Sequence, residues 1–374
     1  MKKTMKAILV RSSAMDAPVH KMAVSLSQNG YDIHVLEWDR AKKYKKQEVI
    51  NGLYVSHRFK LGAPQGKIGL LFYLPLWWIY ELYFLLKEGA DIVHACDFDT
   101  LIPAIFLKLI TRVGLCYTIY DFYSDFPGKI PSQIRNIVFS AEKKAIEFVD
   151  ILFMVNEAMF EELKGINVKQ VIYIYNTPND YPAEIRQVIS GNTSSSMILF
   201  YAGWITKPRG FRYVMESIRN IEDVKLIIAG DGPDKEALDQ NLMKKGKIEY
   251  LGWIPHDEVI RRELEADVLF FFYDPSLLNG KYSSPNKLFE AMMCSKPIIA
   301  NDGLFMSRIV FKEECGIVTP YGDANAITRS ILKLRDNPNL RTSLGKNGRK
   351  AYEERYSWRI MERRLINAYA SLRS

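Results

Sequence analysis

Residues 282–290, which read Tyr-Ser-Ser-Pro-Asn-Lys-Leu-Phe-Glu, combine a predicted helix start with a cation and a carboxylate. Ser283 and Ser284 are expected near the N-cap, so the free N–H groups of the first helical turn point outward. Lys287 and Glu290 then lie one turn apart on one helix face. Such a site can hold a diphosphate and accept hydrogen bonds from ribose hydroxyls. The alternative is an exposed ion pair between Lys287 and Glu290.

A second turn with cations is predicted at residues 201–210, between an apolar run and an amphipathic segment. Gly203 gives this turn a permissive backbone, and Lys207 and Arg209 stand just before Gly210 and the next helix. Two cations beside a helix N-terminus suit a diphosphate. Cations near surface turns are common, so an ordinary solvated turn is the alternative.

Two further glycine turns follow apolar runs in the same half of the chain. Gly230, Asp231 and Gly232 present backbone N–H groups and a carboxylate at the end of a predicted strand. Gly252, directly before Trp253, leaves room for a flat ligand ring to approach the backbone. Either turn is also compatible with a connection that binds nothing.

The first predicted strand leads into residues 11–16, Arg-Ser-Ser-Ala-Met-Asp, which lack the GxGxxG fingerprint. That absence argues against binding of a nicotinamide or flavin dinucleotide at this turn. Ser12 and Ser13 are candidates for contact with a sugar or an acceptor, and a plain first turn of a helix is equally compatible.

No metal and no other cofactor is expected. Arg209 and Lys287 would supply the positive charge that a metal ion otherwise brings to a diphosphate. The half of the chain that carries them has no convincing Asp-x-Asp motif, because residues 97–99 and 121–125 lie in the other half.

Each of these segments follows a predicted strand of a parallel sheet. Residues 6–10, 16–29 and 31–36 read as strand, helix and strand, which is a βαβ unit. Short apolar runs alternate with helix-sized segments through the rest of the chain, so the predicted fold class is α/β with two doubly wound, Rossmann-like sheets. The other predicted strands are residues 53–59, 91–94, 114–119, 150–155 and 171–174, then 198–202, 224–229, 248–250, 268–272, 297–300 and 316–318.

Two domains are expected from the length and from a change in composition. Residues 176–196 are polar and rich in Pro, Ser and Asn, as linkers are. We expect an N-terminal domain at 1–178, a linker at 179–196, a second domain at 197–355 and a closing helix at 356–374 that returns to the first domain. Two such sheets predict a ligand site in the cleft between them.

Several of these motifs resemble, in order and spacing, the GT4 family of retaining glycosyltransferases, whose fold is called GT-B. The likeness covers nearly the whole chain and is most specific in its second half. The segments that carry it are Gly203 with Arg209-Gly210, residues 229–233, residues 250–253, residues 285–291 with the following Lys-Pro-Ile-Ile, and, more loosely, residues 91–96, 117–121 and 356–369.

The resemblance implies a role for each matching residue. Arg209 and Lys287 would hold the donor diphosphate and stabilise its departure, Glu290 would hold the ribose, and Asp121 would orient sugar or acceptor groups. The other donor-site residues it implies are Gly203, Gly230, Asp231, Gly232, Trp253, Ile254, Tyr282, Ser283, Ser284 and Asn286, and the acceptor or sugar contacts are Ser12, Ser13, Asp16 and Tyr120.

The function that the resemblance implies is transfer of a hexose from a UDP- or GDP-sugar to a glycan or polyprenyl-linked acceptor, in the synthesis of cell-surface polysaccharide or glycoconjugate. The chain departs from the family pattern at three places: Tyr282 stands where the first Glu of a paired-Glu motif is usual, Tyr120 stands where a His is usual, and the glycines usual in the helical turn after the first strand are missing. The alternatives are an epimerase or phosphorylase on the same fold and a catalytically degenerate scaffold that binds nucleotide sugar.

The net charge and the cysteines indicate which classes of partner and which cellular compartment to expect. The net charge of +8 favours phosphate-bearing ligands or an anionic membrane surface, and no basic tail points to nucleic acid. The densest basic cluster is Lys42, Lys43, Lys45 and Lys46, which reads as a solvated loop or a membrane contact. Four cysteines without a CxxC pair indicate buried thiols and a cytoplasmic protein, at the inner face of the cell membrane if it docks there.

Residues 68–86 form a long apolar and aromatic stretch with a single charge, Glu81. We weigh three interpretations: a helix packed on its own domain, a helix that also dips into a membrane surface, and a membrane span. The first is preferred because a span would split an otherwise continuous parallel-sheet domain.

Overall fold

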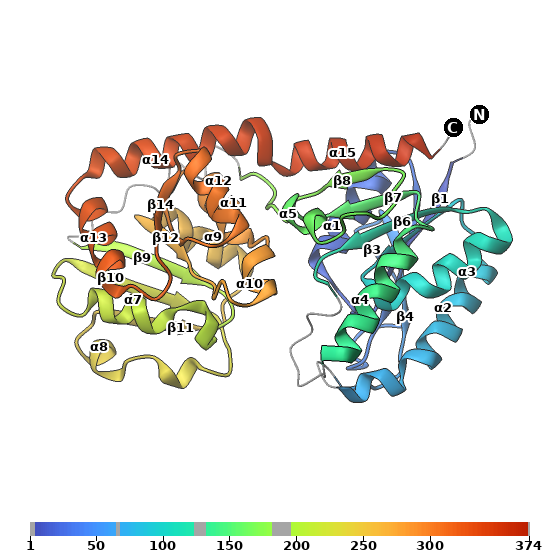
Figure 1. Ribbon diagram of the computed structural model, residues 1–374, viewed down its shortest axis with the longest axis horizontal. Coiled ribbons are helices and arrows are strands. Elements are labelled where there is room, and N and C mark those ends of the chain that lie inside the picture. The colour runs from blue at the N-terminus through green and yellow to red at the C-terminus, as the bar shows by residue number, and fades with distance from the viewer. Residues whose placement is uncertain (1–3, 65–67, 123–131, 182–195, 373–374) are drawn as a thin grey trace. The chain divides into compact units, whose positions relative to one another are not determined.

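The computed structural model describes residues 4–64, 68–122, 132–181 and 196–372 (Figure 1). The chain divides into two compact units, each described here by itself. Unit 1 comprises Met1–Tyr175 with Met361–Ser374, and unit 2 comprises Asn176–Ile360. Both are built around a mostly or wholly parallel sheet, as the alternation of apolar runs and amphipathic segments predicts.

Unit 1 contains an eight-stranded sheet in the order β3-β4-β2-β1-β5-β6-β7-β8. The strands from β4 to β8 pair in parallel, whereas β3 pairs antiparallel with β4 and corrects the prediction of a wholly parallel sheet. β3 escaped prediction because its side chains are exposed or half-buried and show no apolar run. The strands are β1 (Lys6–Arg11), β2 (Asp32–Trp38), β3 (Gln47–Ile50), β4 (Tyr54–Phe59), β5 (Ile92–Cys96), β6 (Gly114–Ile119), β7 (Ile151–Met154) and β8 (Val171–Tyr173).

Right-handed crossovers place α2 and α3 on the opposite face of this sheet from α1, because β4 to β5 and β5 to β6 advance in the opposite direction to β1 to β2. α2 packs on α3, and α3 packs on α4. The helices of unit 1 are α1 (Ala17–Gln28), α2 (Leu74–Glu88), α3 (Leu101–Thr111), α4 (Ser132–Ile146), α5 (Ala158–Glu161) and α15 (Trp358–Ser371).

The apolar stretch at residues 68–86 is divided between two elements. A short 3-10 helix at Ile68–Phe72 precedes α2, whose buried side chains, among them Trp77, Phe84 and Leu85, pack on the sheet side. Trp77 stacks on Trp38 of β2 at 5.5 Å between ring centroids. Within the part of the chain that is described, no helix is both long and apolar enough to cross a membrane.

The closing helix α15 packs on unit 1 through Tyr369. Its hydroxyl lies 2.7 Å from Nδ1 of the buried His94 in β5, and its ring meets Tyr31 edge-on at 5.5 Å. Near the start of the helix, the Met361 sulfur accepts the backbone N–H of Tyr175 at 3.3 Å. The last helix of the chain therefore completes the first unit.

Unit 2 contains a six-stranded, wholly parallel sheet in the order β11-β10-β9-β12-β13-β14. Its strands are β9 (Met197–Ala202), β10 (Val224–Ala229), β11 (Ile248–Gly252), β12 (Val268–Phe271), β13 (Ile298–Asn301) and β14 (Gly316–Thr319). Its helices are α7 (Phe211–Ile218), α8 (Gln240–Lys244), α9 (His256–Glu265), α10 (Leu278–Tyr282), α11 (Asn286–Met293), α12 (Phe305–Lys312), α13 (Ala324–Arg335) and α14 (Pro338–Ala351).

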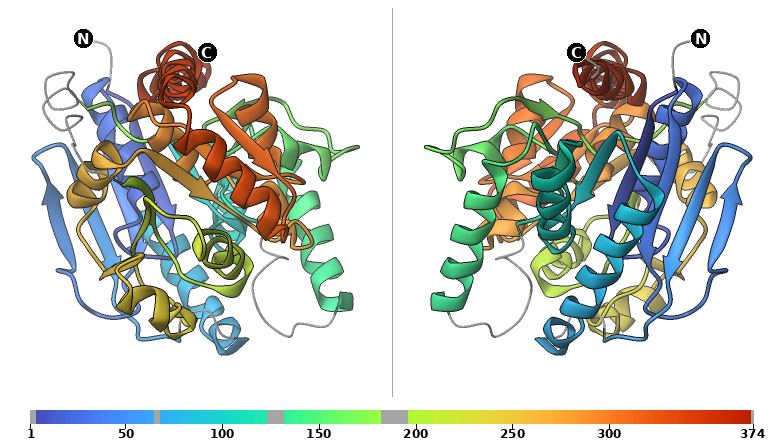
Figure 2. Two further views of the ribbon diagram at one scale, coloured as in Figure 1. Left: turned by 90° about the vertical axis from the view of Figure 1, so that its left-hand side faces the viewer. Right: turned by 90° about the vertical axis from the view of Figure 1, so that its right-hand side faces the viewer.

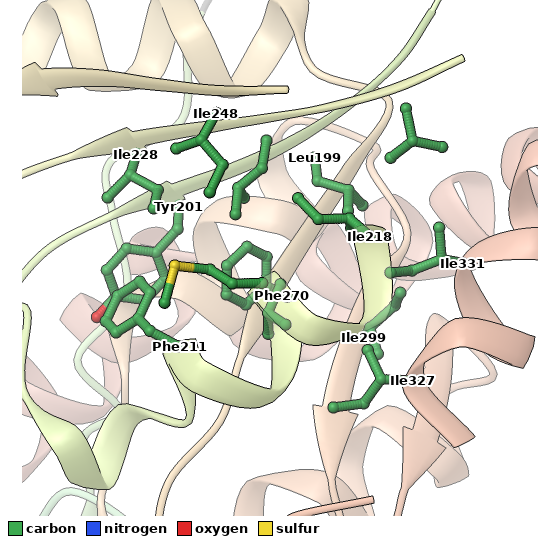
Figure 3. Packing of buried hydrophobic residues seen from close by; sticks show 14 of the residues in the cluster. Leu199, Tyr201, Phe211, Ile218, Ile228, Ile248, Phe270, Ile299, Ile327 and Ile331 are labelled. Atoms are coloured by element: carbon green, nitrogen blue, oxygen red, sulfur yellow. The ribbon is translucent and has the colours of Figure 1, made fainter. Parts of the chain in front are cut away.

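The core of unit 2 lies between the sheet and the helices α7 and α13 (Figure 3). Tyr201, Phe211 and Phe270 meet at its centre, with Phe211 edge-on to Tyr201 at 4.8 Å. This packing holds the carboxyl end of β9 and the start of α7 in a fixed relation. The loop that joins them is the predicted cationic turn.

Residues 176–180, the start of the polar linker segment, are held on unit 2. The Tyr352 hydroxyl donates to the carbonyl of Pro178 at 2.8 Å, and Arg349 makes two hydrogen bonds to the Asp180 carboxylate at 2.7 and 2.6 Å. Residues 182–195 of that segment lie outside the described part of the chain.

Candidate active site

Three glycine turns interlock at the edge of the unit 2 sheet where the carboxyl ends of its strands meet. The N–H of Gly203 donates to Ala229 at 2.9 Å, and the N–H of Gly230 donates to Gly252 at 2.7 Å. A Cβ on Gly230 would lie 1.9 Å from the Gly203 carbonyl oxygen, and one on Gly232 would lie 2.1 Å from that of Ile205. Only glycine fits at either position, so these turns are packed backbone to backbone.

Lys287 enters this edge from the first turn of α11. Its ammonium lies 4.7 Å from the ring centroid of Tyr201 and 2.7 Å from where a Cβ on Gly203 would stand. Gly203 also has a φ of +144°, which side chains with a Cβ rarely adopt. The missing side chain at Gly203 therefore makes room for the cation of Lys287.

Arg209 lies on the neighbouring part of the same edge. It ends a short 3-10 helix at Lys207–Arg209, and its guanidinium carbon is 3.7 Å from the ring centroid of Tyr273, which follows β12. The turn is fixed by Tyr321, whose hydroxyl donates to the carbonyl of Pro208 at 3.2 Å. Because β9 and β12 are neighbouring strands, Arg209 and Lys287 bring two positive charges to one region.

Glu290 is buried, with a relative exposure of 6%, so the expected alternative of an exposed ion pair with Lys287 is wrong. Its carboxylate faces Glu263 of α9, and His256 at the start of α9 places Nε2 3.7 Å from Oε1 of Glu290. Burial together with the charge of Glu290 raises the pKa of Glu263 well above its usual range. The side chains of Glu263 and Glu290 are joined by a hydrogen bond.

Ser283 and Ser284 lie near the N-cap of α11, as predicted. α10 ends at Tyr282, and α11 begins at Asn286 with Pro285 at its N-cap, so neither serine caps the helix. The Ser283 hydroxyl donates to Gly280 at 3.3 Å, and the Ser284 hydroxyl is buried with no hydrogen-bond partner among the described residues. Proline has no side-chain acceptor, so the first N–H groups of α11 have no side-chain cap.

The other predicted donor-site residues lie at the same edge with different exposures. Asp231 is exposed, and hydrogen bonds from Lys235 and the Gly232 N–H lower its pKa, so it is ionised. Trp253 is 75% exposed at the end of β11. Three further residues complete the set, of which Tyr282 is buried, Ile254 is half-buried and Asn286 is exposed.

The sequence-based prediction missed five residues at this edge. Glu263 and His256 approach Glu290 from α9, and Tyr201 and Tyr273 carry the two cations. Trp204, directly after Gly203, is 58% exposed. Trp204 could have been found from the sequence, as an aromatic residue directly after a turn glycine. The other missed residues depend on contacts between distant segments and give no such signal.

At the corresponding edge of the unit 1 sheet, charged side chains form ion pairs with one another. Arg11, at the end of β1, forms ion pairs with Asp16 at 3.1 Å and with Asp97. Asp97 also accepts the Tyr120 N–H at 3.2 Å, and the ring of Tyr120 lies over the Arg11 guanidinium at 4.9 Å. Burial raises the pKa of the Tyr120 hydroxyl well above its usual range. Asp16 is engaged further as the N-cap of α1, accepting from Val19 at 3.4 Å.

Ser12 is buried within this charged cluster. Its carbonyl and hydroxyl oxygens accept from Arg40 at 2.6 and 3.1 Å, and its hydroxyl also bonds to Asp99. Burial raises the pKa of Asp99 to about 6. Ser13 is half-buried, and Asp121 is exposed just before the residues left undescribed.

Glu37 of β2 fixes the first turn and was not predicted. It accepts hydrogen bonds from the Met15 N–H at 2.6 Å, from His20 at 2.7 Å, from Ser56 at 2.8 Å and from Arg58 at 3.2 Å. A buried carboxylate with four donors holds a turn rigidly. Among the residues that the structure describes, no group of three or more His, Cys, Asp or Glu side chains is placed to hold a metal ion.

Each half of the chain matches a family model of known proteins. Residues 183–351 match the family model for glycosyl transferases group 1, and residues 19–177 match that for glycosyltransferase family 4. The lipopolysaccharide core biosynthesis glycosyltransferase LpsD of Rhizobium meliloti is 25% identical over 182 residues, covering 48% of this chain and 50% of LpsD. The alignment thus spans about half of LpsD. The uncharacterized glycosyltransferase MJ1069 of Methanocaldococcus jannaschii is 24% identical over 92% of this chain and 91% of its own.

Solved structures share the two-sheet architecture. Sucrose-phosphate synthase from Thermosynechococcus elongatus superposes with a TM-score of 0.80 at 17% identity, over 98% of this chain and 99% of the other. Anabaena Alr3699/HepE, solved in complex with UDP-glucose, gives 0.70 at 14% identity, over 98% and 100%. These likenesses establish the GT-B fold. The chain belongs to the family 4, or group 1, glycosyltransferases, enzymes that transfer sugar from a nucleotide sugar.

Proposed function

We propose that this enzyme transfers a hexose, with retention of anomeric configuration, from a UDP- or GDP-sugar to a glycan or lipid-linked acceptor in the synthesis of cell-surface polysaccharide or glycoconjugate. The observation that carries the proposal is the pair of cations, Lys287 and Arg209, beside interlocked glycine turns at one sheet edge. The name of LpsD supports the polysaccharide context, and the complex of HepE with UDP-glucose supports a uridine nucleotide.

The chemistry assigned to the cations follows from the charge that develops in the reaction. As the bond from sugar to phosphate breaks, negative charge accumulates on the leaving diphosphate. The ammonium of Lys287 and the guanidinium of Arg209 stabilise that charge, and their positions over tyrosine rings hold them in place before the substrate arrives. Fixed cations cost little reorganisation in the transition state.

Glu290 is assigned to the ribose hydroxyls, with Glu263 as a positioning residue. The hydrogen bond between Glu263 and Glu290 holds the Glu290 carboxylate in place for the ligand. Donor contacts are proposed further for the turns at Gly203, for residues 230–232 and for Trp253 with Ile254 at the base. Residues 282–286 would line the approach to Lys287.

Acceptor or sugar contacts are proposed for Ser12, Ser13, Tyr120 and Asp121, which lie in residues 1–178, the proposed acceptor domain. Asp16 is proposed to act indirectly, by positioning Arg11. Its carboxylate is already bound to Arg11 and to the Val19 N–H at the start of α1. The donor domain is proposed at 197–355. The four described cysteines are buried and free, which supports a cytoplasmic setting.

Calorimetric titration with UDP and GDP, followed by UDP- and GDP-sugars, tests the donor assignment. One nucleotide should bind, and Lys287→Ala and Glu290→Ala should each weaken it by at least about tenfold. Lys312→Ala, an exposed lysine of the same unit, should change nothing. If no nucleotide binds, the donor site is wrongly assigned.

Turnover then separates the enzymes on this fold. A transferase should release nucleoside diphosphate only when an acceptor is added, and the anomeric configuration of the product should match that of the donor. Conversion of the nucleotide sugar without an acceptor would instead indicate an epimerase or phosphorylase. Binding with no turnover in the presence of lipid-linked acceptors would indicate the scaffold that Tyr282 suggests.

A further inference from the structure

The outer surfaces of α2, of α3 and of the 3-10 helix before α2 are apolar except at the C-terminal ends of α2 and α3. The most exposed side chains there include Phe72 at 82%, Ile79 at 67% and Leu109 at 65%. α2 and α3 pack side by side on the same face of the sheet (Figure 2, right). We define the α2–α3 face as Leu71, Phe72, Leu76, Ile79, Tyr83, Leu86, Ile102, Phe106, Leu109 and Ile110.

This surface differs from the outside of an ordinary surface helix, because both helices are largely apolar on the exposed side as well as on the buried side. The inner side of α2 buries Trp77, Phe84 and Leu85, and that of α3 buries Leu101 and Leu107. From residue 71 to residue 110, all of which are described, Lys87 is the only exposed charged residue. Helices of this kind are normally covered by an apolar phase on the second side.

Cations lie at both ends of the α2–α3 face. Lys87 ends α2 and Arg112 caps α3, and both are exposed. At the opposite end, a Cβ on Gly62 would lie 3.5 Å from Cε of Lys42, and one on Gly69 would lie 3.4 Å from Pro64. The exposed cluster Lys42, Lys43, Lys45 and Lys46 therefore adjoins the segment that leads into the start of the face.

The occupant that fits an apolar face with basic ends is the surface of an anionic bilayer. Apolar side chains enter the boundary between headgroups and acyl chains, and lysines at the ends pair with anionic headgroups. A second copy of this chain would bring another net charge of +8 against the first. A spanning helix needs about 20 residues, and α2 has 15.

We propose that the α2–α3 face docks unit 1 on an anionic membrane, with both helices lying in the plane of the interface. The proposal goes beyond the sugar transfer and does not depend on the donor. Trp78 of α2 donates from Nε1 to the Asp99 carbonyl at 2.8 Å, and Asp99 bonds to Ser12. Docking therefore brings the predicted acceptor contacts of unit 1 to the lipid surface.

Cosedimentation of the full chain with vesicles of phosphatidylglycerol and phosphatidylcholine tests this proposal. The wild type should bind, and binding should weaken with salt and with pure phosphatidylcholine. Ile79→Ser combined with Phe106→Ser should lower the partition coefficient by about tenfold or more. Lys43→Glu with Lys46→Glu should lower binding mainly at low salt. Phe311→Ser, an exposed apolar position in unit 2, is the control and should bind as the wild type does.

Two results would overturn the proposal. One is vesicle binding that is absent in the wild type or unchanged in the Ile79 and Phe106 double variant. The other is a wild-type dimer, seen by analytical ultracentrifugation, that the same double variant converts to monomer, since a second copy would then be the occupant. Nucleotide binding measured without vesicles should be equal in all these proteins, so failure of docking is distinguishable from failure of the donor site. Circular dichroism and thermal melting verify that each variant is folded.

Discussion

The carboxyl edges of the two sheets are built on opposite principles. In unit 1 the charges neutralise one another: Arg11 is shared by Asp16 and Asp97, and Glu37 is saturated by four donors. In unit 2 the backbone turns interlock through glycines, and the cations Lys287 and Arg209 lie over tyrosine rings. The same strand topology thus carries one edge where ion pairs dominate and one where two cations lie against aromatic rings.

The difference indicates which kind of ligand group each edge can bind. A cation over an aromatic ring keeps most of its attraction for an anion, because the ring carries no net charge. A cation between two carboxylates is compensated already. Strong recognition of diphosphate is therefore expected from unit 2, and recognition of neutral hydroxyl-bearing groups is the better match for unit 1.

The largest expected effect is on the interlocked turns. Gly230→Ala puts a Cβ 1.9 Å from the Gly203 oxygen at a φ of +128°, and we expect it to lower the free energy of unfolding by about 4 kcal/mol. Gly246→Ala is the matched control, because Gly246 also has a positive φ of +70° but open space around it, and it should cost about 1 kcal/mol. Urea denaturation measures both. Equal costs would mean that the turns are not tightly packed.

Lys287→Ala should lower kcat/KM by about 10²- to 10³-fold, as loss of a group that stabilises a leaving charge does. Lys287→Arg should restore part of the activity, and thermal stability should change little. Steady-state kinetics with the identified donor give the ratio. A Lys287→Ala enzyme with normal kcat/KM would remove the functional contrast between the two edges.

Arg11→Met tests the opposite edge. Removing the guanidinium leaves Asp97 without its ion partner in a largely buried position, and we expect a loss of about 2 kcal/mol in the free energy of unfolding. Nucleotide affinity should stay unchanged, because Arg11 lies in unit 1. Calorimetric unfolding and nucleotide titration on the same variant are the measurements. Weakened nucleotide binding would contradict the expectation that unit 2 alone binds the nucleotide.

Glu81 gives the smallest expected effect and one that depends on pH. It is fully buried in α2 with no hydrogen-bond partner for either oxygen among the described residues, and burial together with Asp99 raises its pKa well above the usual range. The folded state holds this proton more tightly than the unfolded state, so stability falls as pH rises above the pKa of an unfolded Glu.

Glu81→Met should therefore raise the free energy of unfolding by about 1 kcal/mol at pH 8 and by less at pH 5. Chemical denaturation at the two pH values measures the difference. A gain that is larger at pH 5 would show that Glu81 is ionised in the folded protein.

Much of the fold was predictable, because parallel strands buried on both faces read as short apolar runs. β1, β6 and β10 lie within a residue of their predicted bounds. β3 was not predictable, since an exposed edge strand of four residues has no apolar face to show. Ser283 and Ser284 lie near the N-cap of α11, as predicted, and the N-cap itself is Pro285.

The candidate site was predictable where the motif is continuous in sequence and not where it depends on packing. Lys287, Arg209 and the glycine turns were recognised from spacing, and their roles remain predictions. Glu263 gave no signal, because only the folded unit brings α9 against α11. The burial of Glu290 was missed for the same reason, since an i,i+3 pair looks alike on an exposed and a buried helix face.

The closing helix α15 makes unit 1 depend on residues that follow all of unit 2 in the chain. A ribosome therefore finishes the sheet of unit 1 long before it delivers Tyr369 to His94. During that interval the nascent unit 1 lacks the side chains of α15 that are buried in the folded protein, among them Leu365 and Tyr369. Unit 1 is thus begun first during synthesis and completed only when the last helix arrives.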